Sequence, residues 1–115
     1  MKIGAVSQQT GLGIHTIRFY ETQGLIIKPN KDISGHRNYS TQDIELLNWI
    51  ACMKNSGMPL NLIRQYSQAF YQQDNQACLR ILSEHLKHLT QQQLDIEHYL
   101  EVTQSKITRL KKSLT

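Results

Sequence analysis

The chain has 115 residues, of which 39% are hydrophobic and 19% are charged, with a formal net charge of +4 and two cysteines. No apolar run approaches the ~20 residues that span a membrane, and residues 1–4 lack a basic region followed by a long apolar stretch. These features exclude a membrane-spanning chain and a disulfide framework, and they predict a cytoplasmic protein.

Basic residues are concentrated in the N-terminal part of the chain. Residues 1–70 carry seven Lys or Arg against four Asp or Glu, whereas residues 71–115 carry six against five. A basic excess permits nucleic-acid binding but does not prove it. We therefore expect any phosphate-facing surface to lie within the first 70 residues.

Two short helices are predicted at the start of the chain, over residues 3–10 and 14–23. Gly11 and Gly24 are expected to end them, because glycine adopts the left-handed conformation at little cost. Two short helices joined by a three- or four-residue turn that contains glycine predict a helix-turn-helix. The pattern by itself is weak evidence for a DNA reader.

Arg18 lies one turn into the second predicted helix, where it would enter a major groove together with His15 and Thr16. The alternative for Arg18 is a surface salt bridge to Glu21, three residues later. Tyr20 is predicted either to hydrogen-bond a phosphate or to pack beneath the segment that follows.

Residues 25–27 and 36–39 predict two short strands, which would form a β-hairpin wing. Turn-forming residues occupy the segment between them: Pro29, Asn30, Asp32, Ser34 and Gly35. The alternative is a solvated loop. The candidate DNA contacts of the wing are Lys31, His36, Arg37 and Tyr39.

A third helix is predicted to begin after Ser40, which caps free N–H groups, with Asp43 suiting the positive end of the helix dipole. Its apolar face comprises Ile44, Leu47, Ile50 and Ala51, with Trp49 beside it, and residues 55–57 end it. Pro59 fits the first turn of a fourth helix. That helix carries Leu62, Ile63, Tyr66 and Phe70.

Polar residues 72–75 are the predicted linker to a long helix with a heptad pattern. Steps of three and four connect Leu79, Leu82, Leu86, Leu89, Gln93, Ile96, Leu100, Thr103, Ile107, Leu110 and Leu114. A helix of this kind would be ~57 Å long, too long to bury its seam against the small N-terminal domain. An identical chain is the simplest partner, so we predict domains at 1–71 and 76–114 and a homodimer.

The N-terminal ~70 residues resemble the MerR family of bacterial transcription regulators. The motifs that carry the resemblance are Ile3–Ser7, Thr16–Glu21 with Gly24–Ile26, Gly35–Tyr39, and Gly57–Leu60 with Ile63. The resemblance implies a mainly α protein with a small β-hairpin wing: a winged helix-turn-helix followed by a long antiparallel coiled-coil dimerisation helix. It further implies that the homodimer binds a pseudo-palindrome in double-stranded promoter DNA and remodels it so that RNA polymerase can use the promoter.

The wing departs from the family pattern. His36 stands where the family usually has Tyr, and Lys31 stands where it usually has Arg, which replaces a bidentate phosphate ligand with a point charge. Residues after Leu114 supply neither the cysteine-containing loop of metal-sensing members nor a drug-binding domain.

Residues 49–59 resemble the branch that senses aldehydes and other thiol-reactive electrophiles. That resemblance implies that Cys52 is the sensor, with Cys78 as a second thiol. The alternative for Cys52 is a small residue buried between apolar neighbours. The alternative functions are a non-sensing dimeric DNA-binding or adaptor protein and a metal-responsive regulator.

Other chemistry has little support in the sequence. His85 and His88 with distant Cys78 form a weak ligand set, because a dedicated zinc site needs three or four ligands. We expect no metal and no cofactor. The sequence presents no nucleophile–base–orienter constellation and no Gly-rich phosphate loop, so an enzyme is not expected.

Overall fold

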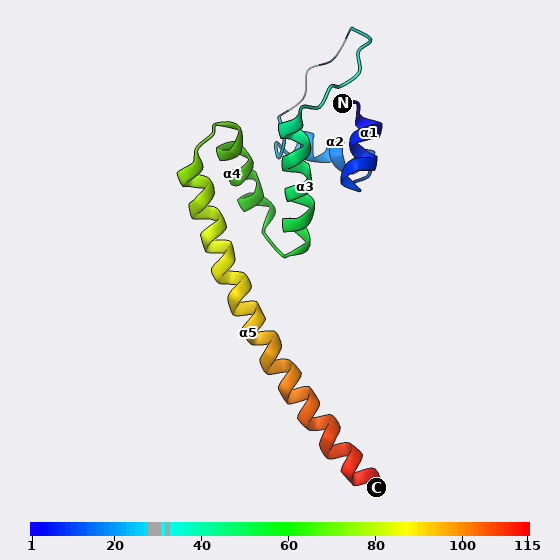
Figure 1. Ribbon diagram of the computed structural model, residues 1–115, viewed down its shortest axis with the longest axis vertical. Coiled ribbons are helices and arrows are strands. Elements are labelled where there is room, and N and C mark those ends of the chain that lie inside the picture. Colours follow the sequence, from blue (N-terminus) through cyan, green and yellow to red (C-terminus); the bar gives the residue numbers. More distant parts are fainter. Residues whose placement is uncertain (28–30, 32) are drawn as a thin grey trace. The chain divides into compact units, whose positions relative to one another are not determined.

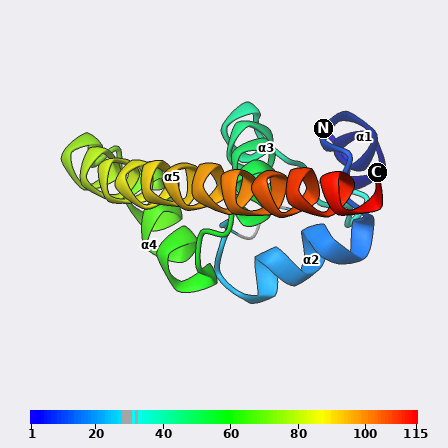
Figure 2. The ribbon, with the colours of Figure 1, turned by 90° about the horizontal axis from the view of Figure 1, so that it is seen from below.

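The structure is a computed structural model that describes residues 1–27, 31 and 33–115 (Figure 1). Five helices follow one another along this part of the chain: α1 (Ile3–Thr10), α2 (Ile14–Thr22), α3 (Thr41–Asn55), α4 (Leu60–Tyr71) and α5 (Asn75–Leu114). The chain divides into two compact units, Met1–Ile81 and Leu82–Thr115. Helix α5 is continuous over 40 residues and belongs to both units (Figure 2). The predicted mainly helical class with a long C-terminal helix is confirmed.

The helix ends follow local capping rules. Gly11 and Gly24 adopt positive φ angles of 75° and 74°, as expected for left-handed glycines that close helices. At the start of α3, the Ser40 hydroxyl accepts the Asp43 amide at 3.1 Å, and the Asp43 carboxylate accepts the Ser40 amide at 2.9 Å. This reciprocal capping box confirms the predicted start of α3.

The predicted linker at 72–75 is a short turn. Gln73 has a positive φ of 58°, and the Asp74 carboxylate accepts the Ala77 amide at 3.1 Å. Asn75 is already helical. Asp74 therefore satisfies a free N–H group at the first turn of α5.

The hydrophobic core lies within the first unit. Helix α3 packs against α1 and α4, and α1 packs against α2. The buried apolar side chains are Val6, Ile17, Tyr20, Leu25, Ile26, Tyr39, Ile44, Leu46, Leu47, Ile50, Met58, Ile63 and Ile81. This core holds α2 by its inner face and leaves its outer face to solvent.

The predicted strand at residues 25–27 is wrong. The Gly24 amide donates to the Glu21 carbonyl at 3.1 Å, and the Leu25 amide donates to the Tyr20 carbonyl at 2.9 Å. Backbone groups that a strand would need thus close the end of α2. Leu25 and Ile26 are buried in the core, whereas Ile27 is 58% exposed.

Strand pairing in the wing, among the described residues, is limited to one antiparallel bridge between Lys31 and Arg37. Pro29, Asn30 and Asp32, predicted as turn residues, lie outside the described residues. Ser34 and Gly35 occupy a turn as predicted. The returning segment is held by side chains, described below.

None of the described helices combines the length and the apolar character needed to cross a membrane.

Candidate nucleic-acid interface

Helix α2 has an inner face that packs against the core and an outer face that is exposed to solvent. Ile17 and Tyr20 are buried, whereas His15, Arg18 and Phe19 are exposed. This division follows from helical geometry, because residues three apart share a face. The outer face therefore presents one imidazole, one guanidinium and one aromatic ring to solvent.

A basic recess lies where the start of α1, the middle of α2 and the wing meet. Its volume is about 120 Å³, and it is lined by Lys2, Ile3, Arg18, Gly35, His36 and Arg37. None of these residues is acidic. Closely spaced cations that remain solvent-accessible can hold a phosphate-sized anion.

The recess gathers three residues that the sequence predicted for DNA contact and one that it missed. Arg18, His36 and Arg37 come together there, and Lys2 joins them. Lys2 contributed to the basic excess, but nothing in its spacing indicates proximity to Arg18. The sequence analysis also missed Phe19 as an exposed residue of α2. Ile17 and Tyr20 are three residues apart and define the buried face of the helix, so their spacing could have placed Phe19 on the exposed face.

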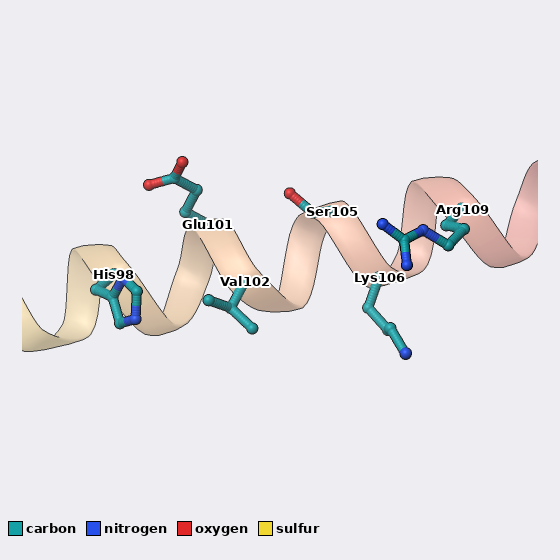
Figure 3. A pocket seen from close by; sticks show the side chains of 6 residues that line it. All are labelled: His98, Glu101, Val102, Ser105, Lys106 and Arg109. Atoms are coloured by element: carbon teal, nitrogen blue, oxygen red, sulfur yellow. The ribbon is translucent and has the colours of Figure 1, made fainter.

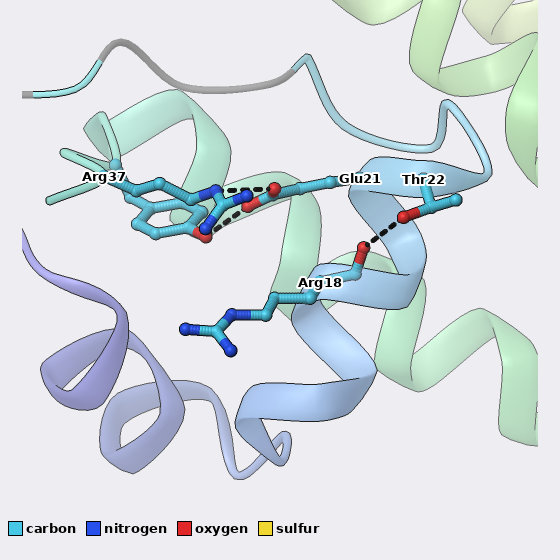
Figure 4. Close-up of polar contacts among 5 residues, drawn as sticks. Arg18, Glu21, Thr22 and Arg37 are labelled. Atoms are coloured by element: carbon cyan, nitrogen blue, oxygen red, sulfur yellow. Dashed lines mark hydrogen bonds and ion pairs between the residues drawn. The ribbon is translucent and has the colours of Figure 1, made fainter. Parts of the chain in front are cut away.

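Glu21 anchors the wing to α2 (Figure 4). Its carboxylate accepts a hydrogen bond from the Tyr39 hydroxyl and pairs with Arg37 Nε at 2.9 Å. The Glu21 side chain is 5% exposed and that of Arg37 is 26% exposed. Burial, followed by the hydrogen bond to Glu21, raises the pKa of Tyr39 well above its ordinary value.

The contacts of Glu21 bear on whether Arg18 forms a surface salt bridge with Glu21, which the sequence left open. Glu21 is taken by Arg37 and Tyr39, and Figure 4 shows the Arg18 guanidinium pointing away from Glu21. Arg18 is exposed. Arg18 therefore faces solvent and does not form the salt bridge to Glu21 that was the alternative.

Two tyrosines that were candidate DNA contacts are part of the core. Tyr20 is 1% exposed and Tyr39 is 2% exposed. Lys54 Nζ lies 5.9 Å from the centre of the Tyr20 ring, a distance suited to a cation–π contact. The burial of Tyr20 favours packing over phosphate contact, and the hydroxyl of Tyr39 is committed to Glu21.

The remaining candidates lie at the surface. Lys31 and His36 are exposed in the wing, His15 is exposed on α2, and Thr16 is partly buried. The Lys31–Arg37 bridge holds Lys31 beside Arg37, which lines the recess.

The two cysteines occupy different environments. Cys52 is exposed on α3, which contradicts the alternative that it is buried. Cys78 is partly buried near the start of α5. Burial and the neighbouring Asp74 charge raise the pKa of the Cys78 thiol, against a smaller opposing effect of a Tyr66 hydrogen bond. The raised pKa lowers the share of Cys78 that is present as the reactive thiolate at neutral pH.

The second unit carries a larger recess, of about 350 Å³, along α5 (Figure 3). It is lined by His98, Glu101, Val102, Ser105, Lys106 and Arg109. All six belong to one helix, so the recess is a groove between side chains of a single helix surface. Elsewhere on α5 the His85 and His88 ring centres lie 6.3 Å apart, and no group of three or more metal-ligating side chains occurs among the described residues.

Comparisons with known proteins identify relatives of this architecture. Residues 1–69 match the family model described as MerR HTH family regulatory protein. The HTH-type transcriptional regulator AdhR of Bacillus subtilis is 36% identical over 74 residues, which cover 64% of this chain and 53% of that protein. The match thus spans about half of that relative's length.

Two further relatives match over more of their length. A probable heavy metal-dependent transcriptional regulator of Haemophilus influenzae is 34% identical over 97 residues, covering 80% of this chain and 73% of that protein. The crystal structure of HiNmlR, described as a MerR family regulator lacking the sensor domain and bound to promoter DNA, is 23% identical with a TM-score of 0.79. That match covers 96% of this chain and 90% of the solved one and supports the fold.

Proposed function

The chain belongs to the MerR family of helix-turn-helix regulatory proteins, and from this premise we propose that it binds promoter DNA as a homodimer and alters the DNA in response to a signal. The observation that carries the proposal is the outer face of α2 beside the basic recess. RNA polymerase is then an indirect partner, reached through the promoter.

The chemistry of this surface suits a DNA duplex. Arg18 is exposed on α2 and can bond a guanine edge or a phosphate. Lys2 and His36 line the same recess and suit the adjacent backbone. The solved relative HiNmlR, which has this fold, is described in complex with promoter DNA.

Two substitutions test the proposed DNA-binding surface, which comprises the outer face of α2, the basic recess and the wing. Arg18→Ala is expected to weaken operator binding by about 1–3 kcal/mol if Arg18 reads a base. Lys31→Ala is expected to weaken binding to all sequences and to reduce the slope of log K against log salt by about one unit, because one phosphate contact is lost. Titrations of operator and unrelated DNA at several salt concentrations separate the two effects.

Lys87→Ala is the matched control, since it removes one charge from an exposed position on α5. It should bind like the parent. If the Arg18→Ala and Lys31→Ala variants also bind like the parent, the DNA-binding surface lies elsewhere.

The dimer is proposed from the second unit. Leu86, Leu100 and Leu114 of the seam are 64%, 64% and 87% exposed in the single chain. Soluble monomers rarely expose contiguous apolar surface of this kind. An antiparallel coiled coil with a second copy would cover it.

For the signal, we propose that Cys52 reacts with an aldehyde. Its exposure allows access. In the reaction, the thiolate sulfur bonds to the carbonyl carbon and the carbonyl oxygen takes a proton, giving a hemithioacetal. A substituent at Cys52 would alter the packing of α3 and thereby the DNA geometry.

A promoter-reporter strain challenged with formaldehyde tests Cys52→Ser. The response should be lost while operator binding is retained, because Cys52 lies on α3 and not on α2, the proposed DNA-contacting helix. Cys78→Ser is the matched control and should respond as the parent does, since the raised pKa of Cys78 disfavours its thiolate. A normal response from Cys52→Ser would remove the sensing proposal and leave the DNA-binding proposal intact.

A further inference from the structure

Arg64 joins helix α4 to the end of α2. Its Nε donates to the Gln23 backbone carbonyl at 2.8 Å, and its Nη2 donates to the Gln23 side-chain Oε1 at 3.4 Å. The two residues are 41 positions apart in the sequence. Within the described residues, α2 packs chiefly against α1, and α4 packs chiefly against α3. Arg64 therefore makes a direct tie between two helices that have different main packing partners.

The tie lies where the end of α2 gains most from a positive charge. Gln23 is the C-cap of α2, and the last turn of that helix carries no basic residue. The C-terminus of a helix bears a partial negative charge and carbonyl groups without an intrahelical partner. Arg64 is partly buried and supplies both the charge and the donor from another element. A hydrogen bond from a charged donor is stronger than one between neutral groups.

A second residue of α4 holds the segment that follows α2. Tyr71 comes seven residues after Arg64, close to two helical turns, so the two side chains share one face of α4. The Tyr71 hydroxyl donates to Asp43 Oδ1 at 2.7 Å and hydrogen-bonds with the backbone of Ile27. Asp43 belongs to the capping box of α3. Helix α4 thus holds the chain both at Gln23 and at Ile27.

We propose that Arg64 is a positioning residue for DNA recognition, which fixes the orientation of α2 and so sets operator specificity without itself contacting DNA. Hydrogen bonds to base edges weaken steeply when distance and angle change, whereas attraction between a cation and a phosphate declines slowly with distance. A less firmly held α2 therefore loses discrimination between sequences before it loses general affinity for DNA. This role rests on the proposed function, in which α2 reads the DNA.

Arg64→Met tests the proposal, because it retains most of the aliphatic side chain and removes the charge and the donors. The operator probe is a duplex that the parent chain selects from a random-sequence pool. Affinity for this duplex should fall ~10-fold, the equivalent of one hydrogen bond to a charged group, and affinity for an unrelated duplex should stay close to that of the parent. The slope of log K against log salt should not change, because no phosphate contact is lost.

Three further variants sharpen the test. Arg64→Lys keeps a charged donor for the Gln23 carbonyl and should recover most of the operator affinity. Arg80→Met is the matched control, since it removes the same charge from an exposed position on α5, and it should bind like the parent. Arg64→Gln keeps a neutral donor and replaces Arg64→Met if the latter does not fold, with a smaller loss of specificity.

NMR of the full chain without DNA measures the contact itself. The ¹³C shift of the Gln23 carbonyl should change in Arg64→Met and stay unchanged in Arg80→Met. A folded Arg64→Met that keeps the parent's ratio of operator to unrelated affinity overturns the positioning role alone. Equal losses on both duplexes with a salt slope lower by about one unit also overturn it, because Arg64 is then a phosphate contact. A parent chain that binds all duplexes alike overturns the proposed function as well.

Discussion

Leu100→Asp is expected to convert the proposed homodimer into monomers. Leu100 lies mid-seam on α5 and is 64% exposed in the single chain. Burial of a leucine side chain contributes about 2 kcal/mol, so loss of both copies in the dimer costs about 4 kcal/mol, which raises the Kd roughly a thousand-fold. Two carboxylates placed in the interface add a desolvation cost to this loss. Sedimentation equilibrium measures the change directly.

Ser105→Asp is the matched control for this experiment. It introduces the same charge on the same helix, but five residues beyond Leu100, which places it about 140° away around the helix axis. The Kd of this variant should stay close to that of the parent. A parent chain that is monomeric at micromolar concentration, or a Leu100→Asp variant that still dimerises normally, would contradict the proposed homodimer.

Glu21→Ala is expected to lower the free energy of unfolding by about 2–4 kcal/mol, because it leaves Arg37 without its carboxylate and the Tyr39 hydroxyl without its acceptor. Urea denaturation at fixed protein concentration measures the loss. Tyr39→Phe removes only the hydroxyl and should cost about 1 kcal/mol.

An exposed acidic residue provides the comparison for Glu21. Glu45→Ala removes a carboxylate from the surface of α3 and should change the free energy of unfolding by less than about 0.5 kcal/mol. Equal effects of the Glu21 and Glu45 substitutions would mean that the carboxylate of Glu21 does not anchor the wing.

The wing shows where reasoning from sequence was insufficient. Residues 25–27 are apolar and β-prone, which predicted a strand. In the folded chain Leu25 and Ile26 are buried and the Leu25 amide completes the end of α2. A short apolar run indicates burial, and periodicity alone does not distinguish a strand from another buried segment.

Local signals in the sequence were sufficient for the helices and their ends. The Ser40–Asp43 capping box and the glycines after α1 and α2 act on neighbouring residues, so their effect can be predicted without knowledge of the fold. The heptad pattern likewise predicted one long helix from repeated spacing alone. The inner face of α2 follows from the same periodicity, since Ile17 and Tyr20 are three residues apart.

Tertiary structure alone decided which charged groups meet. Glu21 is three residues from Arg18 and close enough along the helix to pair with it, yet it binds Tyr39, 18 residues away, and Arg37. Lys2 and Arg18 likewise line one recess although they are distant in the sequence. The exposure of Cys52 depends on how α3 packs. Such partnerships depend on how packing brings distant segments together, and a charged side chain on a helix surface carries no local signal that selects one partner over another.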